Sequence, residues 1–193
     1  MNFDELVKHI KAQGCRVRIY NSRMFIGDAV GSFEPKSCGP IILLATKCWS
    51  KARRTRFLLH EYGHFLQWKD GFWDHIWNVC EADELWHKWV NRRLELTSIE
   101  HAAARNTQLW SEWDAEMRGY NLGISLEVDN FKPQMYLKEA LGYMASIKWS
   151  WKNRKSWNIS IRPRHIKNPR ILTPDELYAP LTSDELVLTH FIK

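Results

Sequence analysis

The sequence predicts an α+β fold, with a small N-terminal β-sheet followed by a helical bundle. Short alternating or continuous apolar segments, separated by glycines, occupy the chain from about residue 15 to residue 46. Segments with the 3.6-residue apolar period of helices fill most of the remaining chain. Hydrophobic residues make up 45% of the 193 residues and charged residues 26%, which is typical of a globular protein with its own core.

The N-terminal part begins with an amphipathic helix and continues with strands. Asn2 can cap that helix, and Gly14 ends it. Glycines separate the extended segments after it, and the last of these is a continuous apolar run, as expected for a buried strand. The predicted elements are a helix over 2–13, a strand over 15–20, short extended segments over 24–26 and 29–33, and a strand over 40–46.

Helices dominate the remainder. Thr97 and Glu100 have the spacing of a capping box, and Thr173 caps a short final helix. Gly71 ends the first of the long helices. The predicted elements are helices over 50–68, 79–96, 97–120 and 132–151, a late strand over 157–161, and a short helix after Thr173.

The charge is concentrated in one segment. The formal net charge is +6, and residues 148–170 contain eight Lys and Arg and no Asp or Glu. This segment therefore carries +8, and the rest of the chain sums to 6 − 8 = −2. We predict a catalytic domain over 1–150 and a basic, Trp-containing extension over 151–193 that packs on the same domain.

Several classes of protein are excluded by the sequence. No apolar run approaches the roughly 20 residues of a membrane span, so we expect no membrane partner. The first residues are acidic, unlike a signal peptide. The four cysteines show no paired spacing, which is typical of free thiols inside a cell. We expect a cytoplasmic protein.

The strongest chemical signal is the HExxH pattern at residues 60–64. On a helix, His60 and His64 lie on one face and can offer imidazole nitrogens to one Zn²⁺ ion. Glu61 lies beside them, where it can take a proton from a water molecule at the metal. The pattern therefore predicts a zinc-dependent peptidase in which Glu61 is the general base.

A catalytic zinc site usually has a third protein ligand. The metzincin pattern would require Gly and His where this chain has Gln67 and Asp70, so that class is excluded. Three other candidates remain open: His75, Glu112 and Glu116.

The motif His60-Glu-Tyr-Gly-His64, followed by a second helix with Glu112, Ala115 and Glu116, resembles the gluzincin metallopeptidases. The most similar groups are the small ImmA/IrrE-type and phage-encoded zinc peptidases. If the protein is encoded by a phage, the expected cytoplasm is that of the host cell. The resemblance implies that Glu112 is the third zinc ligand and that Glu116 accepts the outer N–H of a ligating histidine. In that family the second of these places usually holds Asp or Asn, so Glu116 is a departure from its pattern.

The resemblance also implies how substrate is held. In zincins the strand before the active-site helix pairs with the substrate backbone, which assigns that role to residues 41–45. A tetrahedral intermediate also requires a donor for its developing negative charge. We take Tyr143 as the candidate, followed by Tyr120 and His101.

An alternative function is association with nucleic acid through the segment 148–170. Trp149, Trp151 and Trp157 alternate there with cations, a mixture that suits phosphates and stacked bases. The candidate contacts are Lys152, Arg154, Lys155 and Trp157. Trp68 also gives a resemblance to SprT-like proteases that act on DNA-bound proteins, although the later His motif of that family is absent.

Overall fold

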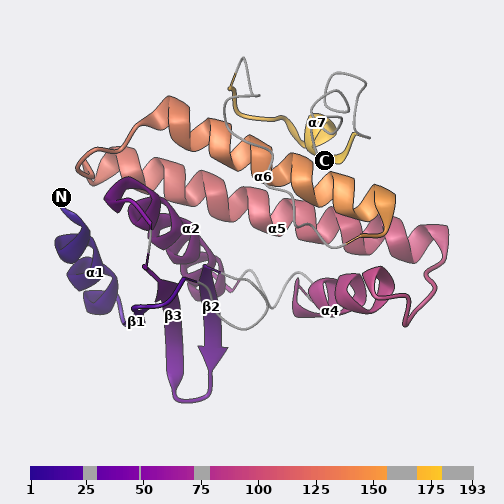
Figure 1. Ribbon diagram of the computed structural model, residues 1–193, viewed down its shortest axis with the longest axis horizontal. Helices are drawn as coiled ribbons and strands as arrows, with labels where there is room; N and C mark the ends of the chain where they lie inside the picture. Colours follow the sequence, from indigo (N-terminus) through magenta and orange to yellow (C-terminus); the bar gives the residue numbers. More distant parts are fainter. Residues whose placement is uncertain (24–29, 48, 72–78, 156–168, 180–193) are drawn as a thin grey trace. The chain divides into compact units, whose positions relative to one another are not determined.

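The α+β prediction is confirmed by the structure, a computed structural model that describes residues 1–23, 30–47, 49–71, 79–155 and 169–179 (Figure 1). A three-stranded sheet in the N-terminal part is followed by helices. The chain divides into two compact units, one made of 1–72 and 114–133 and the other of 73–113 and 134–193. The long helix α5 (Ser98–Ser125) contributes to both units. The predicted division at residue 150 stays a prediction.

The sheet of the first unit has the strand order β1-β3-β2. Its strands are β1 (Arg16–Tyr20), β2 (Gly31–Lys36) and β3 (Gly39–Ala45). The central strand β3 is parallel to β1 and antiparallel to β2, and Phe33 of β2 lies opposite Ile42. Phe33 also meets Phe65 of the following helix edge to face, so one side of the sheet is covered by that helix.

The central position of β3 corrects one expectation. Because β3 pairs with β1 on one side and β2 on the other, both of its backbone edges are already used. The assignment of residues 41–45 to substrate pairing is therefore wrong. Sheet order depends on contacts distant in sequence, which the apolar run itself does not specify. The predicted extended segment 24–26 lies outside the described residues.

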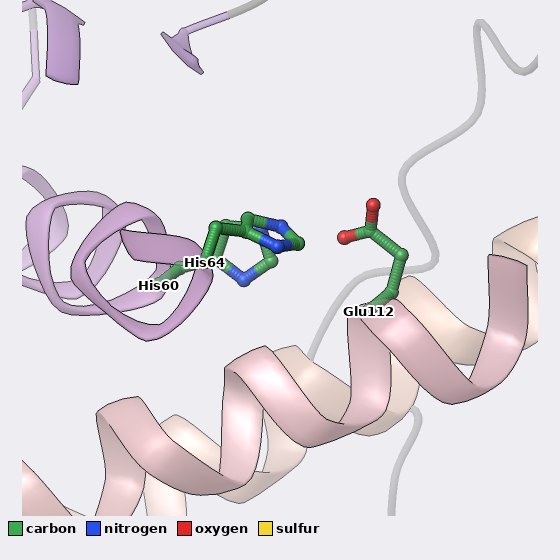
Figure 2. Close-up of side chains that lie close together, drawn as sticks. All are labelled: His60, His64 and Glu112. Atoms are coloured by element: carbon green, nitrogen blue, oxygen red, sulfur yellow. The ribbon is translucent and has the colours of Figure 1, made fainter. Parts of the chain in front are cut away.

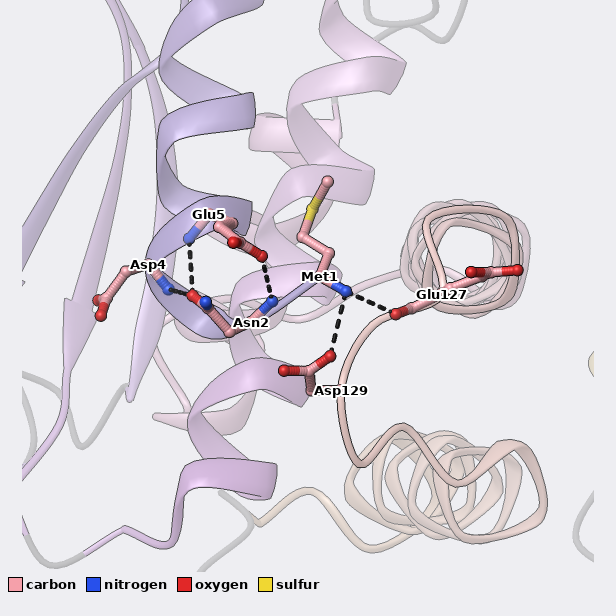
Figure 3. Close-up of polar contacts among 6 residues, drawn as sticks. All are labelled: Met1, Asn2, Asp4, Glu5, Glu127 and Asp129. Carbon is pink, nitrogen blue, oxygen red and sulfur yellow. Dashed lines mark hydrogen bonds and ion pairs between the residues drawn. The ribbon is translucent and has the colours of Figure 1, made fainter.

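Helix α1 (Phe3–Ala12) is fixed at its start by polar contacts (Figure 3). Asn2 and Glu5 form a capping box, as the cap prediction required. The Met1 ammonium donates to the Glu127 carbonyl at 2.7 Å and to Asp129 Oδ1 at 3.1 Å. These bonds attach the beginning of α1 to the segment that follows α5.

Helix α2 (Lys51–Lys69) carries the HExxH motif and agrees with the predicted helix over 50–68, with Ser50 as its cap. Gly63 on this helix lies against Ala115 of α5, and a Cβ at Gly63 would overlap the Ala115 carbonyl oxygen. The two helices approach closely here because glycine has no side chain. Past the end of α2, Gly71 has a φ of 70°, a conformation that favours glycine.

In the second unit, α4 (Val79–Val90) is shorter than the predicted helix over 79–96. Arg92 has a φ of 57°, and the Arg154 guanidinium donates to the carbonyls of Trp89 and Leu94 at 2.9 Å. Arg154 therefore donates to the Trp89 carbonyl in the last turn of α4, which also accepts from the Arg92 N–H, and to the Leu94 carbonyl beyond the helix. This contact comes from a distant part of the chain, so local periodicity overestimated the helix.

The other helices agree with the prediction, with shifted ends. Helix α5 begins at the Thr97–Glu100 capping box and continues five residues beyond the predicted 120. Helix α6 (Pro133–Asn153) and α7 (Pro174–Tyr178), capped by Thr173, complete the described elements. The predicted strand 157–161 lies outside the described residues. Among the described helices, none has both the length and the apolar character required to cross a membrane.

Candidate metal centre

The two histidines of the motif lie side by side on α2, one helical turn apart. Both are buried, with 8% of each residue exposed. Their ring centroids are 4.7 Å apart and the rings are nearly perpendicular. The i, i+4 spacing thus brings His60 and His64 to one face of the helix, as the motif predicts.

Glu112 of α5 completes a group of three potential ligands (Figure 2). One donor atom from each of His60, His64 and Glu112 lies within 4.8 Å of the others. Zinc bonds of about 2.1 Å in a tetrahedral arrangement imply donor separations of about 3.4 Å, so small side-chain rotations would suffice. These three residues could hold a metal ion.

Glu116, one turn after Glu112, lies on the outer side of His60. Its Oε1 is 3.2 Å from Nδ1 of His60 and 2.5 Å from Nη2 of Arg56. The Glu116 carboxylate is fully buried, so the Arg56 guanidinium provides the positive charge that an anion in this position requires. With Nδ1 facing Glu116, the Nε2 nitrogen of His60 remains for a metal.

His64 has a different neighbour on its outer side. Its Nδ1 lies 2.8 Å from Oε1 of Gln67, a side chain with no exposed surface. The Gln67 amide donates in turn to Oδ2 of Asp114 at 3.0 Å. Asp114 also accepts from Arg118, which donates to Asp70 at the end of α2. The outer side of each histidine is therefore occupied by a group from α2 or α5.

Glu61 is directed toward the sheet. Only 7% of this residue is exposed, and a Cβ at Gly31, the first residue of β2, would lie 2.5 Å from Glu61 Oε1. Glycine at position 31 therefore leaves the space that the Glu61 carboxylate fills. The motif's acid stands at the start of an edge strand.

A divalent metal fits this donor set. Two imidazoles and one carboxylate are the protein ligands of many catalytic zinc sites. Nδ1 of His64 has a hydrogen bond with an oxygen, and Nδ1 of His60 lies 3.2 Å from a carboxylate oxygen. These positions suit histidines that bind a metal through Nε2. Glu112 itself is only partly buried.

The roles of the other residues predicted for the site stay predictions. Tyr143 is half-buried on α6 in the second unit, and its role stays a prediction. Tyr120 packs against Phe131, while His101 packs edge to face on Trp89 and Trp151. The third candidate ligand, His75, lies outside the described residues.

The described part of the basic segment uses several of its cations within the protein. Lys148 is buried and donates to the Glu176 carbonyl, and Arg170 pairs with the Glu176 carboxylate. Arg154 contacts Glu95 besides the carbonyls of Trp89 and Leu94. Trp151 is buried and donates to Gln108. Lys152 and Lys155 are exposed, and Trp157 lies outside the described residues, so the nucleic-acid contacts stay a prediction.

Sequence reasoning missed the groups that support the ligands. The sequence assigned no role to Arg56, and Gln67 served only to exclude the metzincin pattern. One signal was visible, because Gln67 follows His64 by three residues and so shares its helix face. The pairing of Arg56 with Glu116 depends on how α2 faces α5, which no local pattern contains.

The chain matches no known family model, no curated protein and no solved structure. The likeness to gluzincins therefore rests on the motif residues and on the group that they form.

Proposed function

We propose that this protein is a zinc-dependent peptidase of the gluzincin type. The observation that carries the proposal is the group of His60, His64 and Glu112 within 4.8 Å, with Glu61 in sequence between the two histidines. The acceptors beside both Nδ1 atoms support it further, because they direct the Nε2 atoms to a common position.

The residues would divide the work of hydrolysis. A bound zinc ion would supply Lewis-acid chemistry, polarising the scissile carbonyl and acidifying water. Glu61 would accept a proton from the attacking water and deliver it to the leaving amine. Glu116 and Gln67 would hold the imidazole rings, and Tyr143 is the candidate donor to the developing negative charge.

The substrate backbone would lie along β2 rather than β3. β2 pairs with β3 on one side only within the described residues, so its other edge is available for an added strand. Gly31 begins this strand and touches the space of Glu61. An extended peptide on β2 would therefore run past the general base, which suits a protein or peptide substrate.

The proposal is tested by zinc content and by hydrolysis in matched variants. We expect the purified protein to contain about one equivalent of zinc and to cleave fluorescein-labelled casein or members of a quenched peptide library. Glu61→Gln should keep the zinc and lose cleavage by at least about 100-fold. Glu112→Ala should lose both. The exposed Glu84→Gln on α4 is the control and should change neither.

Two results would contradict the proposal. Wild-type protein without zinc, even after incubation with Zn²⁺, would remove the metal centre. Equal cleavage by wild type and Glu61→Gln would remove the catalytic role. Salt-dependent binding to single-stranded DNA in the absence of cleavage would favour the alternative nucleic-acid function.

A further inference from the structure

His64 belongs to a network of hydrogen bonds in which each donor and each acceptor is determined by its neighbours. It runs from His64 through Gln67 to Asp114, which also accepts from Nε of Arg118 at 2.6 Å. Arg118 in turn donates to Asp70. All of these residues lie on α2 and α5 or at the end of α2, within the first unit.

We propose that Gln67 is a positioning residue that fixes the tautomer of His64, because Asp114 allows the Gln67 amide only one orientation. This inference rests on the proposed function, since the tautomer selected is the one that binds zinc through Nε2. The constraint depends on which groups can donate a proton and which can only accept one.

Asp114 determines which group of the Gln67 amide donates and which accepts. Its Oδ2 accepts from Arg118 and from Gln67, so the carboxylate is held as an acceptor only. Burial alone would lower the pKa of Arg118, but its hydrogen bonds and charge contacts with Asp70 and Asp114 outweigh this and raise that pKa. Arg118 therefore stays charged beside Asp114, and the NH₂ group of Gln67 must face the carboxylate.

The orientation of the amide then determines the protonation of the imidazole. With its NH₂ group toward Asp114, Gln67 presents Oε1 to His64 at 2.8 Å. An oxygen acceptor at this distance favours a proton on Nδ1, and a neutral ring protonated there has its lone pair on Nε2. Rotating the amide by 180° would set its oxygen against the Asp114 carboxylate and its NH₂ against Nδ1.

The complete burial of Gln67 makes this constraint effective. Water does not reach the Gln67 side chain, so solvent does not supply the missing partners of a reversed amide group. His60 differs, because its Nδ1 faces a carboxylate balanced by Arg56. The two histidines are thus oriented by different chemistry.

The test measures the tautomer of His64 without metal and the affinity for Zn²⁺ separately. Imidazole ¹⁵N spectra of the full chain at pH about 8, where histidine is mostly neutral, report which nitrogen is protonated. Comparison with His64→Asn assigns the signals. We expect wild-type His64 to be protonated at Nδ1, and Gln67→Leu to populate both tautomers. Competition with a chromophoric chelator should show zinc binding about 10- to 100-fold weaker in Gln67→Leu.

Two further variants separate positioning from general stability. Asp114→Asn keeps the size of the side chain but can offer a donor to Gln67, so both amide orientations become acceptable and the tautomers should mix. Gln108→Leu removes another buried glutamine, which accepts from Trp151, and should leave the tautomer and the zinc affinity unchanged.

The outcomes distinguish this inference from the proposed function. Protonation of His64 at Nδ1 in both Gln67→Leu and Asp114→Asn, with unchanged zinc affinity, would overturn the positioning role while zinc binding stands. A wild-type protein that binds no zinc would overturn the proposed function, yet the tautomer of the metal-free protein would still decide the role of Gln67.

Discussion

Gly63 of α2 and Ala115 of α5 lie in direct contact, with no room for a single methyl group at position 63. Gly63 immediately precedes His64, and Ala115 immediately precedes Glu116. This close contact between the two helices therefore lies at the level of the metal ligands. Larger side chains here would move the carboxylates away from the imidazoles.

Gly63→Ala is expected to destabilise the protein by about 1–3 kcal/mol, the usual effect of overfilling a packed core. This loss would occur even though alanine favours the helical conformation over glycine by about 1 kcal/mol, an effect that acts in the opposite direction. Urea unfolding gives the stability, and zinc titration gives the effect on the site. Ala103→Gly, at an exposed position of α5, measures the helix-propensity effect alone. A stabilised Gly63→Ala protein with normal zinc affinity would contradict the close contact.

Arg56→Met is expected to lower the free energy of unfolding by about 3 kcal/mol, because it leaves the buried Glu116 carboxylate without its cation. Chemical denaturation measures the loss. In the double variant Arg56→Met/Glu116→Gln the uncompensated charge is gone, so much of the stability should return. A single variant that loses less than about 1 kcal/mol would show that the ion pair contributes little.

Gly31→Ala is expected to reduce peptidase activity by about 100-fold, because the new methyl group would occupy the space of the Glu61 carboxylate. Zinc content should stay the same, since Gly31 is not one of the three ligands. Ser32→Ala is the matched control, because its side chain points to the opposite face of β2. Equal activity in the two variants would mean that Glu61 tolerates displacement.

The buried Cys15 thiol gives a pH dependence of stability. Burial raises the pKa of Cys15 to about 11, whereas the unfolded thiol loses its proton near pH 9. Between these values the unfolded chain releases a proton that the folded chain keeps, so stability falls as pH rises. We expect the stability difference between wild type and Cys15→Ala to shrink by about 1–2 kcal/mol from pH 9 to 11. A constant difference would contradict this.

Local patterns predicted much of the fold. The predicted caps at Asn2, Thr97 and Thr173 begin helices because each cap acts within a few residues of itself. The end of α4 was wrong because Arg154 reaches it from a distant part of the chain. The sheet order was missed for the same reason. β1 pairs with β3, which is not the next strand in the sequence, so the pairing depends on contacts distant along the chain.

The candidate site divides in the same way. His60, Glu61 and His64 follow from one motif on one helix, and a resemblance singled out Glu112 and Glu116. Arg56 and Asp114 contact the opposite helix, so their contacts appear only once α2 and α5 face each other. Gln67 lay between these cases, because its spacing from His64 was visible but its partner Asp114 was not.

The supporting contacts of the metal centre have a practical consequence. Each potential ligand and its supporting groups lie within residues 56–70 at α2 or 112–118 of α5, joined at one glycine contact. A pair of designed helices with a glycine at their crossing could accept these two segments as a graft. The transplanted helices would carry both histidine orientations with them, and zinc affinity in the new scaffold would depend little on the rest of the host.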